Sequence, residues 1–291
     1  MTAQLTLTIE AGVNRLGEQE AFGRIDIRPG DTLSIVGPTG SGKSAFIKDI
    51  ETLAQRDTIT CRRILINGEE PPESFVREPA FKPISLITQN TRCLADLSVE
   101  EFLLMHIRAR KPGRNDLLGE TLDLANTFTG EGISLNNRMS SLSGGQTRSL
   151  MIADALVIGA TPILLLDEIE NAGIFKDRVI RALKVGNKAV ILVTHDPYMA
   201  LTTERRIVMR HGGVASVIEP GDQEQNLIKD LAEIETYLHR IREEIRLGAS
   251  FVGASFTSFT SLPDSSDALS SDALMTPAKR DGISERNGIS E

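Results

Sequence analysis

Polar and apolar residues follow two different patterns along the chain, and each pattern predicts a kind of strand. Residues 5–9 and 24–27 alternate apolar and polar positions, which is the period of a strand with one buried face. Residues 163–166 and 189–193 are instead wholly apolar, which is typical of central parallel strands buried on both faces. Stretches with helical spacing separate these runs. Strands that alternate with helices indicate an α/β fold built on a mainly parallel sheet.

Further strands are predicted beside these runs. Residues 63–66 and 84–88 are short apolar strands, and residues 206–209 and 214–218 form a terminal hairpin through a Gly-Gly turn. The stretch 68–83 is acidic and contains four prolines, so we expect it to be a surface loop. The N-terminal strands are expected to form an antiparallel β portion beside the parallel sheet.

The middle of the chain has helical spacing. Ser98 and Glu101 have the spacing of a capping box at the start of one helix, a second helix is predicted over 116–128, and a third runs from 143 to 158. Because polar turns link these helices, residues 90–158 are predicted to form a small helical subdomain inserted into the α/β core.

The C-terminal region divides into a helix and a tail. Residues 222–248 are predicted to form an amphipathic helix, and residues 249–291 a disordered tail, because Ser, Asp, Gly and Thr dominate it and its apolar residues are aperiodic. Packing of the helix on its own domain is the favoured interpretation, and self-association or a partner helix is the alternative. Its apolar residues recur at steps of four and three: Leu227, Leu231, Ile234, Leu238, Ile241 and Ile245.

Composition narrows the class of protein. The chain has 291 residues, a net charge of -8 and 25% charged residues, so one or two globular domains are expected and nucleic acid is not an expected partner. Its two cysteines, Cys61 and Cys93, form no metal-binding spacing, which indicates a reducing cytosol and no zinc site. The opening residues lead into an alternating stretch, and no run of about 18 apolar residues occurs, so neither a signal peptide nor a membrane span is expected.

The strongest motif lies between a predicted strand, which ends at Val36, and a predicted helix. It fits Gly-x-x-x-x-Gly-Lys-Ser, the phosphate-binding P-loop, in the strand-to-helix setting that this motif requires. Glycines allow the backbone amides to surround a phosphate, and the N-terminus of the following helix favours the same anion. The lysine would reach the β- and γ-phosphates, and the last serine would ligate Mg²⁺. The predicted phosphate-binding residues are Gly37, Pro38, Thr39, Gly40, Ser41, Gly42, Lys43 and Ser44.

Five further features follow the P-loop in a fixed order. They are Gln89 at the end of a strand, Leu-Ser-Gly-Gly-Gln at 142–146, an apolar strand ending in Asp-Glu at 163–168, the loop 171–174, and Val-Thr-His-Asp at 193–196. Together these features resemble the ATP-binding cassette (ABC) family of ATPases, over roughly residues 5–219. The resemblance implies a P-loop NTPase core and a nucleotide-binding domain over residues 1–221, with ATP and Mg²⁺ as its cofactors.

The resemblance also assigns roles to single residues. Asp167 would hold Mg²⁺ as a Walker B aspartate does, together with Ser44 and Gln89. Glu168 lies where the family has the base that orients the attacking water. His195 corresponds to the switch histidine that contacts the γ-phosphate. Glu168, His195 and Gln89 are therefore the predicted catalytic residues.

The Leu-Ser-Gly-Gly-Gln signature implies a dimer. Ser143, Gly144, Gly145 and Gln146 would offer a hydroxyl, backbone amides and a helix N-terminus to phosphate. In the family this signature completes the site of a second subunit, so that two ATP molecules lie between two head-to-tail chains. Because the chain has one P-loop and one signature, a second ABC subunit is implied, either a second copy or a related chain.

Some positions depart from the family pattern. Leu16 lies where an aromatic residue usually stacks on adenine, and Ile174 lies where the loop after Walker B usually has Asp. Ile169 and Glu170 replace the common Pro-Thr after the catalytic Glu, and Asp154 replaces a frequent Arg in the signature helix. None of these changes removes a phosphate, Mg²⁺ or base residue, so hydrolysis is expected to be retained.

Three functions are compatible with these motifs. The favoured one is the ATP-binding subunit of a membrane transporter, which would be cytoplasmic and peripheral at the inner face of the cell membrane, beside a membrane-spanning subunit. Gln89 and the segment 97–103 resemble the part of such a subunit that receives a membrane partner. The alternative is a soluble ABC ATPase that remodels or assembles a partner protein. A nucleotide-gated adaptor without turnover is disfavoured by the presence of Glu168 and His195.

Overall fold

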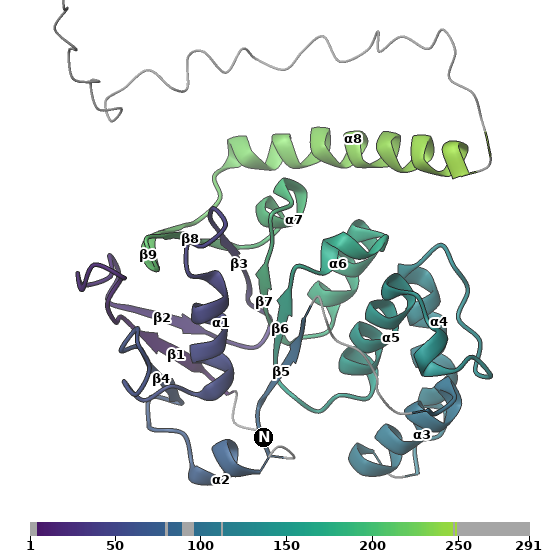
Figure 1. Cartoon of the computed structure of the whole chain (residues 1–291), viewed down its shortest axis with the longest axis horizontal. Coiled ribbons are helices and arrows are strands. Elements are labelled where there is room, and N and C mark those ends of the chain that lie inside the picture. The colour runs from purple at the N-terminus through teal and green to yellow at the C-terminus, as the bar shows by residue number, and fades with distance from the viewer. Residues whose placement is uncertain (1–4, 79–80, 89–95, 112, 247, 249–291) are drawn as a thin grey trace, which may run out of the picture. The chain divides into compact units, whose positions relative to one another are not determined.

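Two β-sheets organise the chain (Figure 1). The structure, a computed structural model, describes residues 5–78, 81–88, 96–111, 113–246 and 248. A three-stranded antiparallel sheet has the order β2-β1-β4, and a six-stranded sheet has the order β5-β6-β7-β3-β8-β9. The strands are β1 (Leu7–Glu10), β2 (Arg24–Ile27), β3 (Thr32–Val36), β4 (Arg63–Ile66), β5 (Ile84–Ile87), β6 (Ile163–Asp167), β7 (Ala189–Val193), β8 (Arg205–Arg210) and β9 (Gly213–Ile218).

The larger sheet is parallel from β5 to β8, and only β9 runs antiparallel, as the second strand of a hairpin with β8. Neighbouring parallel strands β6 and β7 are far apart in sequence because a helix connects them, as parallel pairing requires. The predicted α/β class, with a mainly parallel sheet and an antiparallel N-terminal portion, is therefore confirmed.

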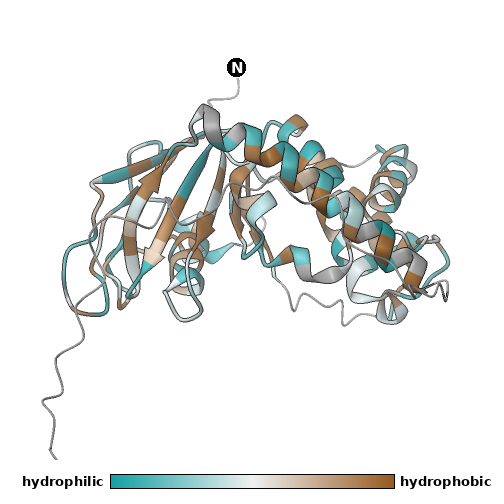
Figure 2. Ribbon diagram, turned by 90° about the horizontal axis from the view of Figure 1, so that it is seen from above, coloured by the Kyte–Doolittle hydropathy of each residue, from teal (hydrophilic) through white to brown (hydrophobic). Residues whose placement is uncertain are grey.

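Alternate residues of the central strands enter two different cores. On β6, Ile163 and Leu165 face one core, and Leu164 and Leu166 face the other. The first core also contains the three-stranded sheet and helix α1 (Lys43–Thr52), and the second contains the helices that lie between β5 and β8 in the sequence. In Figure 2, hydrophobic segments occur on strands and on one side of several helices. The wholly apolar runs in the sequence follow from burial on both faces.

The helices of the second core include the predicted helical portion. They are α3 (Val99–Arg110), α4 (Leu117–Phe128), α5 (Gly144–Val157) and α6 (Lys176–Val185), followed in the chain by α7 (Pro197–Leu201). Ser98 caps α3 with the predicted capping box, because its side chain accepts from the Glu101 amide while the Glu101 carboxylate accepts from the Ser98 amide.

The prediction of a loop over residues 68–83 was wrong in part. The short helix α2 (Glu73–Arg77) lies within it, and the Arg77 side chain pairs with Glu73 one turn earlier. A helix of five residues is too short to produce a readable apolar period, which is why the proline-rich composition dominated the prediction.

The last helix of the described chain is α8 (Asp222–Arg246). The chain divides after Arg240 into two compact units, and the first unit carries every strand named above. Within that unit, α8 is fixed by ion pairs of Glu224 with Arg206 and of Glu235 with Lys176. Across the described residues, no helix has the length and apolar character that a membrane span needs. The predicted disordered tail, residues 249–291, lies outside the described residues.

Candidate active site at the strand ends

The candidate site forms where three parallel strands end. Val193 at the end of β7 pairs with Ile35 of β3 on one side and with Asp167 of β6 on the other. The P-loop follows β3, the Asp-Glu pair ends β6, and His195 follows β7. Parallel register therefore brings the P-loop to the same edge of the sheet as two segments that follow it by more than a hundred residues. Open α/β sheets bind ligands at this edge.

The P-loop is shaped for close backbone approach. Gly42 has a φ of 104°, and a Cβ there would lie 2.7 Å from the Cα of Gly212 at the tip of the β8–β9 hairpin. A Cβ on Gly37 would lie 2.5 Å from the Met209 carbonyl oxygen. Lys43 Nζ donates to the carbonyls of Gly37 and Pro38 at 2.8 and 3.2 Å, so its ammonium lies within the loop. This arrangement fits an anion of the size of a phosphate.

One buried polar atom in the loop strengthens that fit. The Ser41 hydroxyl is buried and makes no hydrogen bond to the residues that the structure describes. The N-terminus of α1 begins at Lys43, so its first amides and its dipole face the same space. Phosphate oxygens accept hydrogen bonds, and this loop offers them a hydroxyl and backbone amides as donors.

Asp167 and Ser44 form the candidate Mg²⁺ ligands. Burial raises the pKa of the Asp167 carboxyl, and the negative charges of Glu168 and Glu170 raise that pKa further, while Lys43 and His195 oppose them. The effect of Lys43 on this pKa indicates that the P-loop and the end of β6 belong to one electrostatic site. A carboxylate and a hydroxyl are the oxygen ligands that Mg²⁺ prefers, so the residues present fit the ion.

Glu168 and His195 lie together at this edge. His195 Nε2 is 3.3 Å from Glu168 Oε1, and the two side chains are 46% and 28% exposed. Glu168 has a φ of 49° and a ψ of 49°, a left-handed conformation that is uncommon for a non-glycine residue. Its amide donates to the Val193 carbonyl at 2.9 Å, which holds the strained residue against β7. Backbone strain of this kind often occurs at functional sites.

Glu170 lies two residues after Glu168, in the 3₁₀ turn η2 (Ile169–Ala172). Its Oε1 accepts hydrogen bonds from the Thr194 hydroxyl at 2.7 Å and from the His195 amide at 2.8 Å. Burial lowers the pKa of Arg148 in α5, and the charge of Glu170 opposes that shift. Glu170 is therefore electrostatically linked to the signature helix as well as hydrogen-bonded to the histidine segment.

The segment after His195 is tied to α8. Asp196 caps α7 by accepting from the Met199 amide, and its carboxylate also pairs with Lys176. Lys176 Nζ lies 3.0 Å from Glu235 of α8. Burial lowers the pKa of Lys176, but its hydrogen bonds to Asp196 and Glu235 outweigh burial, so the net shift is upward. These contacts keep a charged lysine between the histidine segment and α8.

The Leu-Ser-Gly-Gly-Gln signature opens α5. Ser143 and Gln146 form a reciprocal capping box, with the Gln146 amide donating to Ser143 Oγ at 3.3 Å and the Ser143 amide donating to Gln146 Oε1 at 2.9 Å. Their side chains also bond to Glu131 and Gly132, in the loop after α4. The described contacts of the signature are therefore with the helical portion, and none of them joins it to the P-loop of the same chain.

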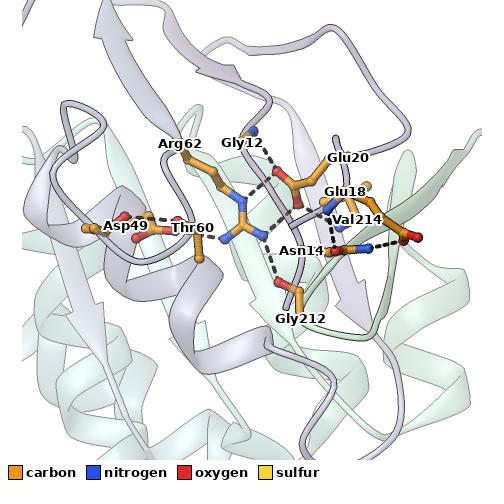
Figure 3. A network of polar contacts seen from close by, with 10 residues as sticks. Gly12, Asn14, Glu18, Glu20, Asp49, Thr60, Arg62, Gly212 and Val214 are labelled. Atoms are coloured by element: carbon orange, nitrogen blue, oxygen red, sulfur yellow. Dashed lines mark hydrogen bonds and ion pairs between the residues drawn. The ribbon is translucent and has the colours of Figure 1, made fainter. Parts of the chain in front are cut away.

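A buried cluster of charged side chains around Arg62 contacts the tip of the β8–β9 hairpin at Gly212 (Figure 3). Arg62 is fully buried and donates to Glu20 at 2.9 and 2.6 Å and to Asp49 of α1 at 2.8 Å. It also donates to the Gly212 carbonyl at 3.2 Å, and Gly212 donates to the Ser41 carbonyl at 2.9 Å. Arg62 thus links α1, the loop between β1 and β2, and the hairpin tip that touches the P-loop. The sequence analysis did not find this cluster.

The family departures have clear structural settings. Leu16 is 68% exposed at the tip of the β1–β2 loop, whereas Ile174 is 7% exposed and packs in the second core. Asp154, which replaces a frequent Arg in α5, is hydrogen-bonded to His106 of α3, with 2.9 Å between Asp154 Oδ2 and His106 Nδ1. Gln89 lies outside the described residues.

Comparison with known proteins finds relatives among ABC transporter ATP-binding proteins. Residues 24–171 match the family described as ABC transporter. The chain is 47% identical over 242 residues to the uncharacterized ABC transporter ATP-binding protein MJ0121 of Methanocaldococcus jannaschii, a match that covers 83% of this chain and 93% of that protein. It is 28% identical over 200 residues to the sn-glycerol-3-phosphate import ATP-binding protein UgpC of Escherichia coli K12, covering 67% of this chain. The match spans only 54% of UgpC.

Solved structures share the fold. CbiO1 from Clostridium perfringens, part of the ABC transporter complex cbiONQ, is similar with a TM-score of 0.58 and 21% identity over 83% of this chain and 100% of its own. The ATP-binding cassette MJ0796, in a dimeric post-hydrolysis state bound to ADP and phosphate, is similar with a TM-score of 0.55 and 26% identity over 75% of this chain and 99% of its own. The fold predicted from the motifs is confirmed by these matches.

Proposed function

The chain belongs to the ABC transporter family of ATP-binding proteins, whose members bind and hydrolyse ATP, and we propose that it is the Mg²⁺-dependent ATPase subunit that drives a membrane transporter. The observation that carries the proposal is the meeting of the P-loop, Asp167, Glu168 and His195 at the ends of β3, β6 and β7. The phosphate-binding loop, a carboxylate suited to Mg²⁺ and the proposed base therefore share one edge of the sheet.

The chemistry follows from these side chains. P-loop amides and Lys43 bind the phosphates, and Lys43 is charge-matched to the β- and γ-phosphates. Ser44 and Asp167 would hold Mg²⁺, which when bound neutralises charge that develops on the transferred phosphoryl group. Glu168 would orient the attacking water, and His195, whose Nε2 lies 3.3 Å from Glu168 Oε1, would hold that carboxylate in place and contact the γ-phosphate. Gln89 is proposed to contribute to the same Mg²⁺ and water positions.

The dimer is the second part of the proposal. The signature residues Ser143–Gln146 have their described contacts in the helical portion, so they are available to complete the phosphate site of another chain. A second copy arranged head to tail would place one signature over each P-loop. The dimeric state of MJ0796 with ADP and phosphate supports this arrangement for a related cassette.

Glu168→Gln tests hydrolysis and dimerisation together. The variant keeps the shape of the side chain but removes the charge that orients water, so ATP should bind, turnover should stall, and an ATP-bound dimer should accumulate. Light scattering after size exclusion, with ATP and Mg²⁺, measures the dimer, and phosphate release measures turnover. Glu120→Gln, an exposed change on α4, is the matched control. A monomeric Glu168→Gln protein with wild-type turnover would contradict both roles.

A soluble ATPase that remodels or assembles a partner protein is the second candidate. One observation favours it: Ile174 is buried in the core at a position where an exposed aspartate would couple the two sites of a dimer. Purification of the tagged full chain from solubilised native membranes and from cytosol distinguishes the two candidates. A membrane-spanning protein that copurifies supports the transporter subunit, located in the cytoplasm against the inner face of the membrane. A soluble partner alone supports remodelling.

A further inference from the structure

Glu170 occupies a position that carries a short hydroxyl side chain in the family pattern, and it makes contacts that such a side chain would not reach. Its Oε1 accepts from the His195 amide at 2.8 Å and from the Thr194 hydroxyl at 2.7 Å. A threonine oxygen is attached at Cβ, whereas the glutamate oxygens are attached at Cδ, two bonds further out. Glu170 therefore ties the turn after β6 to the segment after β7.

Both sides of the histidine backbone are held by this contact. The Thr194 hydroxyl donates to Glu170 and accepts from the Asp196 amide at 3.0 Å, so His195 lies between two bonded residues. Thr194 is 1% exposed, and water does not compete freely for these bonds. Hydrogen bonds to an ionised acceptor are stronger than those between neutral groups. The backbone of His195 is fixed by a carboxylate, while its imidazole stays half-exposed.

Besides these two hydrogen bonds, the charge of Glu170 acts on Arg148 of α5. Oε2 is buried and accepts no hydrogen bond from the residues that the structure describes. A buried carboxylate oxygen without a hydrogen bond costs stability. Such a cost is typical of functional sites.

We propose that Glu170 is a positioning residue for the ATPase reaction, which holds the His195 backbone so that the imidazole stays beside Glu168. This proposal rests on the proposed ATP hydrolysis and adds to it a residue that the family pattern does not supply. Because Glu170 contacts the His195 segment and not the P-loop, its loss should lower kcat far more than it changes the affinity for ATP. A displacement of about 1 Å at a reacting group can cost 10²-fold, so we expect about 10- to 100-fold for Glu170→Ala.

The test compares Glu170→Ala with the conservative variant Glu170→Gln in the full chain. Glutamine keeps a carbonyl oxygen at the position of Oε1, so both hydrogen bonds remain possible and turnover should stay within about threefold of wild type. Glu170→Asp retracts the carboxylate by one carbon and should fall between them. ATP affinity, measured by calorimetry without Mg²⁺ so that the effect of Glu170 on Asp167 does not enter, should change much less than turnover in all three. Equal losses in the alanine and glutamine variants, or wild-type turnover in the alanine variant, would overturn the proposal.

A double-mutant cycle separates positioning from a general structural effect. In a His195→Ala background, Glu170→Ala should slow turnover by less than about twofold, because the residue through which it acts is already absent. Independent residues would give effects that multiply. A full additional loss would show that Glu170 does not act through His195. The cycle needs measurable residual turnover, so it is run as single-turnover phosphate release with enzyme in excess.

Hydrogen exchange of the nucleotide-free protein gives a second readout that does not depend on activity. Peptides that cover residues 190–198 should exchange faster in Glu170→Ala than in wild type and at the wild-type rate in Glu170→Gln, because the His195 amide loses its acceptor only in the first. Glu120→Ala is the control. Unchanged exchange in Glu170→Ala would contradict the proposed hold on His195. If wild type hydrolyses ATP and Glu168→Gln stalls while Glu170→Ala does not slow, this inference alone fails.

Discussion

Two groups of charged side chains lie near the P-loop, and they are built in opposite ways. The cluster around Arg62 is closed: Arg62 and Glu20 are 0% exposed, and the guanidinium donates to two carboxylates and a carbonyl. The group at the ends of β6 and β7 is open. There Glu168 is strained, His195 is 46% exposed, and one oxygen of Glu170 has no hydrogen bond to the described residues.

This difference separates residues that hold the fold from residues available for chemistry. In the Arg62 cluster both carboxylates share one guanidinium and also accept hydrogen bonds from other groups of the chain, so the geometry does not depend on a ligand. At the strand ends, Asp167, Glu168 and Glu170 lie close together, and burial, followed by the charges of Glu168 and Glu170, raises the pKa of Asp167. Such a group is completed by a cation. Mutations in the first group should therefore lower the free energy of unfolding, and mutations in the second group should lower the rate of turnover.

The largest effect should come from Arg62→Met. Removal of the guanidinium leaves Glu20 and Asp49 buried without their partner, which costs about 3–5 kcal/mol in comparable cases. The free energy of unfolding, measured with urea in the absence of nucleotide, should fall by that amount. Conversion of the carboxylates to amides in the same chain, with Glu20→Gln and Asp49→Asn, should restore part of the loss, because no buried charge is then unpaired.

The neighbouring residue provides the control. Arg63 pairs with Glu70, but their side chains are 33% and 67% exposed, and surface pairs contribute about 0–1 kcal/mol. Arg63→Met should therefore change the unfolding free energy by less than about 1 kcal/mol. Equal losses from Arg62→Met and Arg63→Met would mean that burial does not distinguish these two arginines, and the comparison would be wrong.

Lys43→Ala should give the second-largest effect, now on ligand binding. It removes the main positive charge of the phosphate site, so ATP affinity should fall by at least about 100-fold, or about 2.7 kcal/mol. The unfolding free energy should change by less than in Arg62→Met, since the lysine partners are two loop carbonyls and no buried carboxylate. Calorimetry with ATP and a urea melt measure the two quantities. Unchanged ATP affinity would contradict the assignment of the P-loop.

Sequence reasoning reached the open group and missed the closed one for a physical reason. The P-loop, Asp167 and His195 each follow an apolar run, and parallel strand register brings such positions to one edge. Arg62 lies directly before β4, and no motif or period in the sequence marks it as buried. Its partners Glu20 and Asp49 are 42 and 13 residues away in the sequence. A long-range ion pair leaves no periodic signal, so a buried arginine and a surface arginine look the same in the sequence.

Glu170 is an intermediate case. The sequence shows that it departs from the family pattern, but not that its carboxylate reaches the His195 amide. That contact depends on the tight turn at Glu168, whose positive φ no residue pattern around it predicts. The sequence therefore does not predict the backbone conformation at this site, because the surrounding structure, and not local residue preference, imposes the strain.

We expect a smaller effect on the preference for adenine over guanine, which concerns the loop that carries Leu16 and Glu20. Leu16 is 68% exposed in the loop that Glu20 anchors, and it offers no aromatic ring to a base. Stacking on a base is worth about 1–3 kcal/mol in single-stranded nucleic-acid sites, so its absence should leave ATP preferred over GTP by less than about tenfold. Competition binding measures the ratio. A preference of a hundredfold or more would mean that another side chain grips adenine.

The smallest effect should appear in the pH dependence of stability, through a charge that belongs to neither group. Lys188 Nζ donates to the carbonyls of Gly159 and Thr161 at 3.0 and 2.7 Å and has no carboxylate among its described partners. Burial, and secondarily the charge of Lys111, lowers the pKa of Lys188 from 10.5 to about 8. Unlike Arg62, this cation is disfavoured by its surroundings.

The sign of the pH effect follows from proton binding. Between about pH 8 and 10.5 the unfolded chain keeps the proton on Lys188 while the folded chain has lost it, so the unfolded state binds more protons and stability rises with pH. Below pH 8 the full cost of the buried charge is present, and above 10.5 it is gone. Compared with Lys188→Met, wild type should gain unfolding free energy across this window, by less than complete burial would give because solvent still screens the group. Lys184→Met, an exposed change on α6, is the control. If wild type and Lys188→Met changed in parallel from pH 8 to 10.5, hydrogen bonds to two carbonyls would be sufficient to keep this lysine charged, and a carboxylate partner would not be what distinguishes the closed group.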